Sequence, residues 1–176
     1  MNKIDKLIES LEKIKGVGYK TARKYAYDIV ELSNQDKDNL INNISNTKVL
    51  NHCDTCNNII NQECNNCKNI SIKLIITISP KDSEKLKEIY SNFTYFCLLT
   101  IFDPLNNKEL NLSKLSNFLK SNNFETIYCL LPIDQEGSIT KEEIKKINSS
   151  IKFISIGYSN SIDNTDKEVL KNLIRE

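Results

Sequence analysis

Apolar residues recur at helical spacing through the first third of the chain. The first stripe, in residues 3–14, consists of Ile4, Leu7, Ile8, Leu11 and Ile14. A second stripe, in residues 20–33, consists of Ala22, Tyr25, Ala26, Ile29 and Val30. This spacing predicts two amphipathic helices, joined through a short segment that contains Gly16 and Gly18. A third helix is expected over residues 36–45.

From residue 71 onward, short apolar runs alternate with amphipathic stretches. The apolar runs predict strands at residues 72–79, 93–100, 126–132 and 151–157. The stretches between and after them predict helices at 80–92, 111–122, 138–149 and 164–176, with a loop at 102–110. Such alternation is typical of an α/β fold, here a four-stranded, largely parallel sheet with flanking helices.

Four of the six cysteines fall between these two regions, as two C-x-x-C pairs. The pairs are Cys53 with Cys56 and Cys64 with Cys67. Each pair can direct two thiolates at one tetrahedral ion, so we expect one structural Zn²⁺ per chain. Four unrelated thiols or a redox dithiol are the alternatives. The short segment has too few apolar residues for a core of its own, so we expect the metal to stabilise it.

Three other residues near or beyond this segment are weaker candidates for chemistry. His52 precedes the first cysteine and could replace it as a ligand, although a position beside the site or on the surface is the better interpretation. Cys97 and Cys129 lie in apolar strand-like runs, which favours buried core thiols.

The chain therefore divides into a helical part (1–49), a four-cysteine part (50–70) and an α/β part (71–176). Its net charge of +1 excludes a uniformly basic nucleic-acid coat. No apolar run reaches the length of a membrane span, and the first residues lack the apolar core of a signal peptide. We therefore expect no membrane contact and a cytoplasmic location.

Five basic residues cluster around the two glycines, in a stretch of twelve residues without an acid. They are Lys13, Lys15, Lys20, Arg23 and Lys24. Gly16 and Gly18 would permit positive φ at both ends of the turn, with Val17 packed between the helices. The N–H groups at the start of the second helix could then bind a phosphate. The pattern favours sequence-independent binding of a nucleic-acid backbone; an ordinary helical connection with a solvated basic face is the alternative.

The order of these parts resembles the bacterial recombination mediator family RecR. Residues 7–32 look like that family's helix-hairpin-helix, and Lys20, Thr21, Ala22 and Lys24 fall on its motif positions. Residues 52–67 look like its zinc finger, and residues 71–176 like its Toprim domain. The resemblance implies a ring- or clamp-forming homo-oligomer that binds DNA, and we expect a homodimer or homotetramer. It also implies that RecO, and RecF where it exists, are partners in loading RecA onto DNA coated with single-strand-binding protein.

The Toprim part departs from the family pattern. The acidic pair expected after the first strand is replaced by Ile78 and Ser79, and the later strand ends at Asp134 without Asp-x-Asp. The family's partner-docking loops are shortened at 102–107 and 161–170, and one motif survives in part at 134–140. Magnesium-dependent phosphoryl chemistry needs carboxylates at such positions, so we expect no catalysis. Two alternatives stay open: a Toprim-type nuclease or primase-like enzyme, and a zinc-stabilised interaction module without DNA binding.

Overall fold

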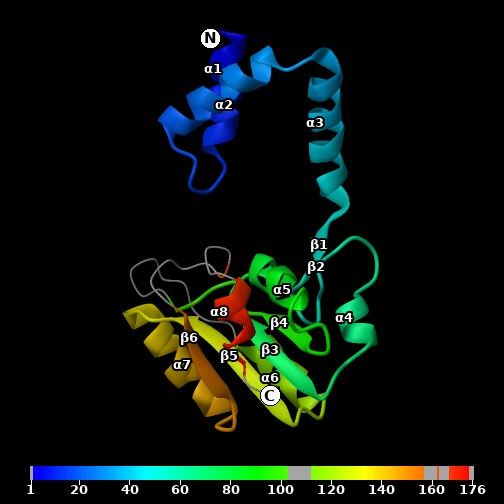
Figure 1. Ribbon diagram of the computed structural model, residues 1–176, viewed down its shortest axis with the longest axis vertical. Helices are drawn as coiled ribbons and strands as arrows, with labels where there is room; N and C mark the ends of the chain where they lie inside the picture. The colour runs from blue at the N-terminus through cyan, green and yellow to red at the C-terminus, as the bar shows by residue number, and fades with distance from the viewer. Residues whose placement is uncertain (1, 103–111, 157–161, 163–166, 175–176) are drawn as a thin grey trace. The chain divides into compact units, whose positions relative to one another are not determined.

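The computed structural model describes residues 2–102, 112–156, 162 and 167–174. The chain forms two compact units, Met1–Val49 and Leu50–Glu176. The first is helical, and the second combines the four-cysteine segment with a mixed α/β domain (Figure 1). The predicted fold class is confirmed.

The first unit is built on a pair of helices, α1 (Lys3–Glu12) and α2 (Tyr19–Glu31). They meet through a small core of Ile8, Ala22 and Ala26, with Ile4, Leu7, Leu11 and Val17 packed around it. The two alanines are fully buried, and their short side chains let the helix backbones approach closely. Val17 packs between the helices as predicted.

Several residues of the predicted apolar stripes lie outside this core. Ile14 is 54% exposed because α1 ends at Glu12, two residues earlier than expected. Tyr25 and Val30 are 45% and 53% exposed, so the buried stripe of α2 is narrower than its apolar pattern indicated.

The third helix, α3 (Asn34–Asn46), is followed by a short 3-10 turn, η1 (Thr47–Val49). Ser33 caps α3, since its hydroxyl accepts a hydrogen bond of 3.1 Å from the N–H of Asp36. The helix buries none of its side chains, and Ile41 and Ile44 are each 60% exposed. Its apolar face therefore has no cover within this unit.

The second unit begins with the cysteine segment, which contains the small hairpin β1 (Asn51–His52) and β2 (Ile59–Ile60) and the short helix α4 (Asn65–Lys68). A four-stranded sheet follows, with the order β4-β3-β5-β6. Its strands are β3 (Lys73–Thr77), β4 (Thr94–Cys97), β5 (Thr126–Pro132) and β6 (Lys152–Ile156). All three strand pairs are parallel, so β4 and β6 are the edges.

Helices cover both faces of this sheet (Figure 1). Alternate residues of each strand point to opposite faces, which produces two buried clusters. One cluster joins Leu74, Ile76, Cys129 and Leu131 to α6 (Ser113–Lys120) and α7 (Gln135–Ile147). The other joins Ile75, Tyr95, Tyr128 and Leu130 to α5 (Pro80–Lys87) and α8 (Lys167–Lys171). Cys97 and Cys129 are fully buried, as predicted.

The helix boundaries differ from the predicted ones in places. Helix α5 ends at Lys87, whereas its pattern predicted a helix to residue 92. It begins where predicted because Ser79 caps it, accepting a bond of 3.2 Å from the N–H of Asp82. Residues 103–111 of the predicted loop and its flank, and residues 164–166 and 175–176 of the last predicted helix, lie outside the described residues.

Candidate metal centre and nucleic-acid interface

Four thiols converge in the cysteine segment. Cys53 follows β1, Cys56 ends the next turn, and Cys64 and Cys67 lie at the start and within α4. The four sulfur atoms all lie within 4.8 Å of one another. The Sγ atoms of Cys53 and Cys67 are 3.8 Å apart, and those of Cys56 and Cys64 are 3.5 Å apart. A tetrahedron with Zn–S bonds of about 2.3 Å has edges of about 3.8 Å, so these thiols could hold a metal ion.

The backbone around the first pair is shaped to direct both sulfurs inward. Asn57 has φ of 61°, and its N–H donates to the carbonyl oxygen of Cys53 at 2.9 Å. The N–H of Cys53 donates in turn to the carbonyl oxygen of Asn58 at 2.8 Å. The side-chain amide of Asn58 donates to Sγ of Cys56 at 3.2 Å.

The thiol pKa values differ within the cluster. Burial alone would raise the pKa of Cys53, but hydrogen bonds from the backbone of Cys56 and Thr55 outweigh it and lower the value from 9.0 to about 7. Burial raises the pKa of Cys64 to about 11 and raises that of Cys67 further. Without metal, Cys64 and Cys67 therefore carry protons at neutral pH. A metal ion that binds all four sulfurs must displace these protons.

His52 lies beside the cluster but is not one of its converging groups. It is exposed, and its Nδ1 is 2.9 Å from the carbonyl oxygen of Asn57. That contact places the ring at the turn rather than among the sulfur atoms. The interpretation of His52 as a residue next to the site fits this geometry.

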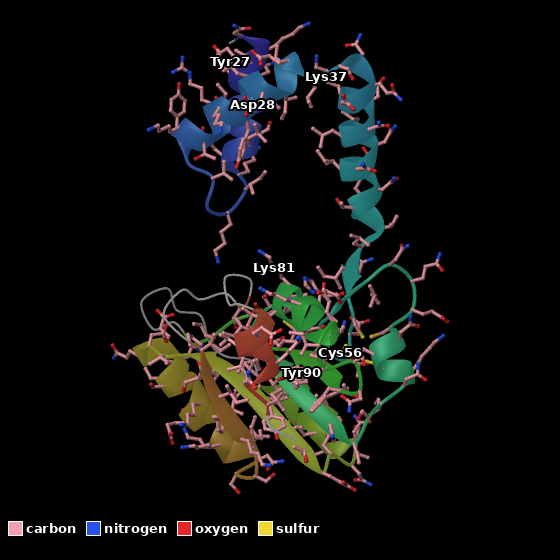
Figure 2. All side chains as sticks on the ribbon, viewed as in Figure 1. Tyr27, Asp28, Lys37, Cys56, Lys81 and Tyr90 are labelled. Atoms are coloured by element: carbon pink, nitrogen blue, oxygen red, sulfur yellow. The ribbon has the colours of Figure 1, made fainter. Side chains whose placement is uncertain are left out.

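The cysteine segment packs against β4, an edge of the sheet (Figure 2). The N–H of Cys97 donates to the carbonyl oxygen of Cys56 at 2.9 Å, and the side chain of Asn57 donates to the carbonyl oxygen of Cys97 at 2.7 Å. Asn66 bonds both backbone groups of Tyr95, accepting from its N–H at 2.7 Å and donating to its carbonyl oxygen at 2.8 Å. The segment thus occupies hydrogen-bonding groups that an edge strand would otherwise expose.

The turn between α1 and α2 has one glycine with positive φ, not two. Gly16 has φ of +85°. Gly18 has φ of −87° and ψ of 170°, and it is the residue that caps α2, with its carbonyl oxygen accepting from the N–H of Ala22. The expectation of positive φ at Gly18 is therefore wrong, because the chain there is already extended for entry into the helix. A Cβ at either glycine would meet nothing within 4 Å.

Three of the five predicted basic residues come together on α2. Lys20, Arg23 and Lys24 line a shallow hollow of about 470 Å³, together with Tyr19 and Tyr27. None of the three cations has an ion-pair partner among the residues that the structure describes. Lys13 and Lys15 are exposed at the end of α1 and in the turn, but they do not line the hollow.

The positions that carry acids in Toprim enzymes have structural roles here. Ile78 packs against the core under β3, and Ser79 caps α5. At the surviving motif, Asp134 caps α7 by accepting a bond of 2.6 Å from the N–H of Gly137. Within the described ranges, the four cysteines are the only group of three or more His, Cys, Asp or Glu side chains that converge on one point.

Two features of these sites escaped the sequence analysis. The asparagines that dock the cysteine segment on β4 have no signal in the pattern, because the chain is rich in asparagine throughout. The position of Tyr19 and Tyr27 beside the cations does have a signal in the sequence. Each tyrosine lies four residues from Arg23, so all three share a face of the predicted helix. No described helix is long and apolar enough to cross a membrane.

Comparison with known proteins agrees with these features. Residues 4–48 match the family model of the RecR helix-hairpin-helix. "Recombination protein RecR" of Chlamydia caviae is 27% identical over 172 residues, covering 88% of this chain and 84% of the relative. The protein of the same name from Streptococcus mutans is 31% identical over 130 residues, covering 68% of this chain and 64% of the relative. The protein of the same name from Latilactobacillus sakei is 27% identical over 155 residues, covering 82% of this chain and 77% of the relative. The predicted resemblance to the RecR family is therefore confirmed, and it extends over most of the chain.

Proposed function

We propose that this protein is a DNA-binding recombination mediator in recombinational DNA repair. The single observation that carries the proposal is the unpaired cation group of Lys20, Arg23 and Lys24 on α2, within the segment that matches the RecR helix-hairpin-helix. The relatives named "Recombination protein RecR" support the assignment to recombination.

The DNA contact in this proposal is made to phosphates. The first turn of α2 has N–H groups without helical partners, and Gly18 at its cap offers no side chain to cover them. A phosphate bound there is flanked by Lys20 and Lys24, which lie in the first two turns. Lys13 and Lys15, on the other side of the turn, add longer-range attraction. Such contacts carry no sequence information, so the protein binds DNA of any sequence.

The metal in this proposal is a structural zinc ion held by Cys53, Cys56, Cys64 and Cys67. The four cysteines would supply a closed shell of thiolates to the ion, which would leave no open position for a water molecule. The ion stabilises a segment with little apolar core of its own, and that segment covers the edge of the sheet at β4. Zinc therefore contributes to folding and takes no part in a reaction. The proposed role includes no catalytic step.

Assembly belongs to the same proposal. One hairpin offers only a few phosphate contacts, and useful affinity comes from several hairpins on one DNA molecule. The exposed apolar residues of the first unit, among them Val30, Ile41 and Ile44, support a homodimer or homotetramer that forms a clamp. Working in the cytoplasm at the nucleoid, the clamp acts with RecO, and with RecF where that partner exists. Together they load RecA onto single-stranded DNA coated with single-strand-binding protein.

The experiment that tests DNA binding replaces Lys20 and Lys24 together by alanine. Affinity should fall for all sequences about equally, and the log–log dependence on salt should become shallower by close to one unit per lost contact. The matched control is Lys145→Ala with Lys146→Ala, which removes the same charge from exposed positions on α7. If the Lys20 and Lys24 variant binds DNA as tightly as the parent, the hairpin is not the DNA site. A magnesium-dependent cleavage of DNA by the parent protein would contradict the non-catalytic role.

A further inference from the structure

Two tyrosines bracket the cations on α2. Tyr19, Arg23 and Tyr27 follow one another at intervals of four residues, so their side chains emerge along one face of the helix. Tyr19 is 61% exposed and Tyr27 is 48% exposed, and Figure 2 shows Tyr27 on α2. Ala22 and Ala26 form an adjacent stripe of α2, and this stripe packs in the helix-pair core. Neither tyrosine ring belongs to that core.

The hollow between these side chains combines two kinds of surface. All of its lining residues in the described part of the chain are aromatic or cationic. The guanidinium of Arg23 lies over the ring of Tyr27, with its carbon 5.8 Å from the ring centroid. A ligand that fits this lining has flat apolar faces and negative charges close together. Unpaired nucleotides have both, as a base and its phosphate.

We propose that this hollow is a subsite for single-stranded nucleic acid, in which bases stack on Tyr19 and Tyr27 while Lys20 and Lys24 hold the phosphates. The inference rests on the proposed function, and it adds which form of DNA the hairpin prefers. In a duplex each base is already stacked on its neighbours, so its faces are not available to a tyrosine. Only a single strand can use the rings as well as the cations.

The spacing of the two tyrosine rings determines whether they stack on one base or on two. A helix rises about 1.5 Å per residue, so the Cα atoms of Tyr19 and Tyr27 lie about 12 Å apart along the axis. That distance is too large for the two rings to sandwich one base. Each ring therefore takes its own base, and the strand runs along α2 past Arg23. The guanidinium of Arg23 lies over one face of Tyr27, and in this proposal a base stacks on the other face.

The first test uses fluorescence in the full-length protein. The chain contains no tryptophan, so Tyr19→Trp and Tyr27→Trp each introduce a single reporter. We expect a short oligothymidine to quench both reporters strongly, because thymine stacks on the indole. The matched control is Tyr25→Trp, at a position on the same helix that is 45% exposed but does not line the hollow. Equal quenching at all three positions, or quenching only at Tyr25→Trp, would overturn the proposal.

The second test compares affinities for a single strand and for a duplex of the same sequence. In Tyr19→Ala with Tyr27→Ala, we expect single-strand affinity to fall at least about fivefold, while duplex affinity changes less than twofold. Tyr19→Phe with Tyr27→Phe keeps the rings and should keep the affinity. Helical circular dichroism checks that each variant is folded.

The possible outcomes separate this inference from the proposed function. If the alanine variant loses single-strand and duplex binding equally, or loses neither, stacking is wrong. If the alanine variant of the two tyrosines keeps full affinity for both forms of DNA, the Lys20 and Lys24 variant decides the other proposal. A loss of single-strand and duplex binding in that lysine variant would leave the DNA-binding proposal intact. If the parent protein binds neither form of DNA, both proposals fall.

Discussion

Gly16 and Gly18 lie two residues apart, but only Gly16 has a backbone conformation that favours glycine. Gly16 has φ of +85°, which side-chain-bearing residues rarely adopt. Gly18 has φ of −87° at the start of α2, a conformation that any residue can take. Neither position is crowded, since a Cβ at either would meet nothing within 4 Å. The difference between them is therefore purely one of backbone conformation.

The same substitution at both positions tests this difference. We expect Gly16→Ser to lower the free energy of unfolding of the helical unit by about 1–2 kcal/mol, because the left-handed region is unfavourable for L-residues. Gly18→Ser should have little effect or stabilise slightly, since serine is a good helix cap. Urea denaturation followed by helical circular dichroism measures both. Equal losses in the two variants would contradict the assignment of strain to Gly16 alone.

Metal binding by the four thiols should depend on pH. The pKa of Cys64 is raised to about 11 and that of Cys67 is raised further by burial, so both thiols are protonated in the free protein at neutral pH. Binding therefore displaces their protons, and zinc affinity should rise with pH from about 6 to 8. Calorimetry in buffers of different ionisation enthalpy should find more than one proton released per zinc at pH 7. Proton release near zero would contradict four-thiolate binding.

At the scale of elements, the cysteine segment and the sheet depend on each other through β4. The N–H groups of Tyr95 and Cys97 face away from β3 and donate to Asn66 and Cys56 of the segment. Asn58 adds a bond of 3.0 Å from its side chain to the carbonyl oxygen of Tyr95. An edge strand without such cover exposes a row of unpaired backbone groups, which promotes association between chains.

Removing the metal should therefore uncover β4 selectively. After chelation we expect the amides of Tyr95 and Cys97 to exchange with deuterium much faster, because their acceptors lie in the released segment. Strands β3 and β5, which lie inside the sheet, should remain protected. Hydrogen exchange followed by NMR or mass spectrometry measures this, with the amides of α2 as an internal control in the other unit. Unchanged exchange at β4 would mean that the segment keeps its structure without metal.

At the scale of the whole molecule, the two units differ in how well they cover their apolar residues. The sheet of the second unit has a buried cluster on each face. The first unit has one small cluster and leaves Val30, Ile41 and Ile44 more than half exposed. Exposed apolar side chains on two helices of such a small unit are available for contact with another chain. This contrast supports the proposed assembly through the helical unit.

Assembly should therefore be sensitive to charge on α3. We expect the parent protein to sediment as a dimer or tetramer, and Ile41→Asp with Ile44→Asp to shift it to a smaller species. The control is Ile72→Asp, at a position in the second unit that is 51% exposed. Sedimentation velocity over a range of concentrations measures the species. A parent protein that is monomeric at every concentration, with and without DNA, would contradict the clamp.

Local patterns in the sequence were sufficient to predict the helices and strands and the cluster of four thiols. The alternation of apolar runs after residue 71 predicted the four strands and the helices between them, because side-chain periodicity follows from backbone geometry within one element. The two C-x-x-C pairs predicted the converging thiols, since each pair lies within one turn. The basic stretch predicted five clustered cations, of which Lys20, Arg23 and Lys24 line one hollow.

What the sequence could not determine is set by contacts between distant residues. The strand order β4-β3-β5-β6 and the docking of the cysteine segment on β4 depend on partners far apart in the chain, such as Leu74 with Ile127 and Asn57 with Cys97. Asparagines 57, 58 and 66 have no distinguishing pattern, because their partners are backbone groups of another element. The short helix α1 covers only part of α2. This limited cover leaves Tyr25 and Val30 exposed, and it leaves Tyr19 and Tyr27 on the surface beside the cations. Sequence periodicity gives the face of a helix, but only the tertiary structure decides which part of that face is buried.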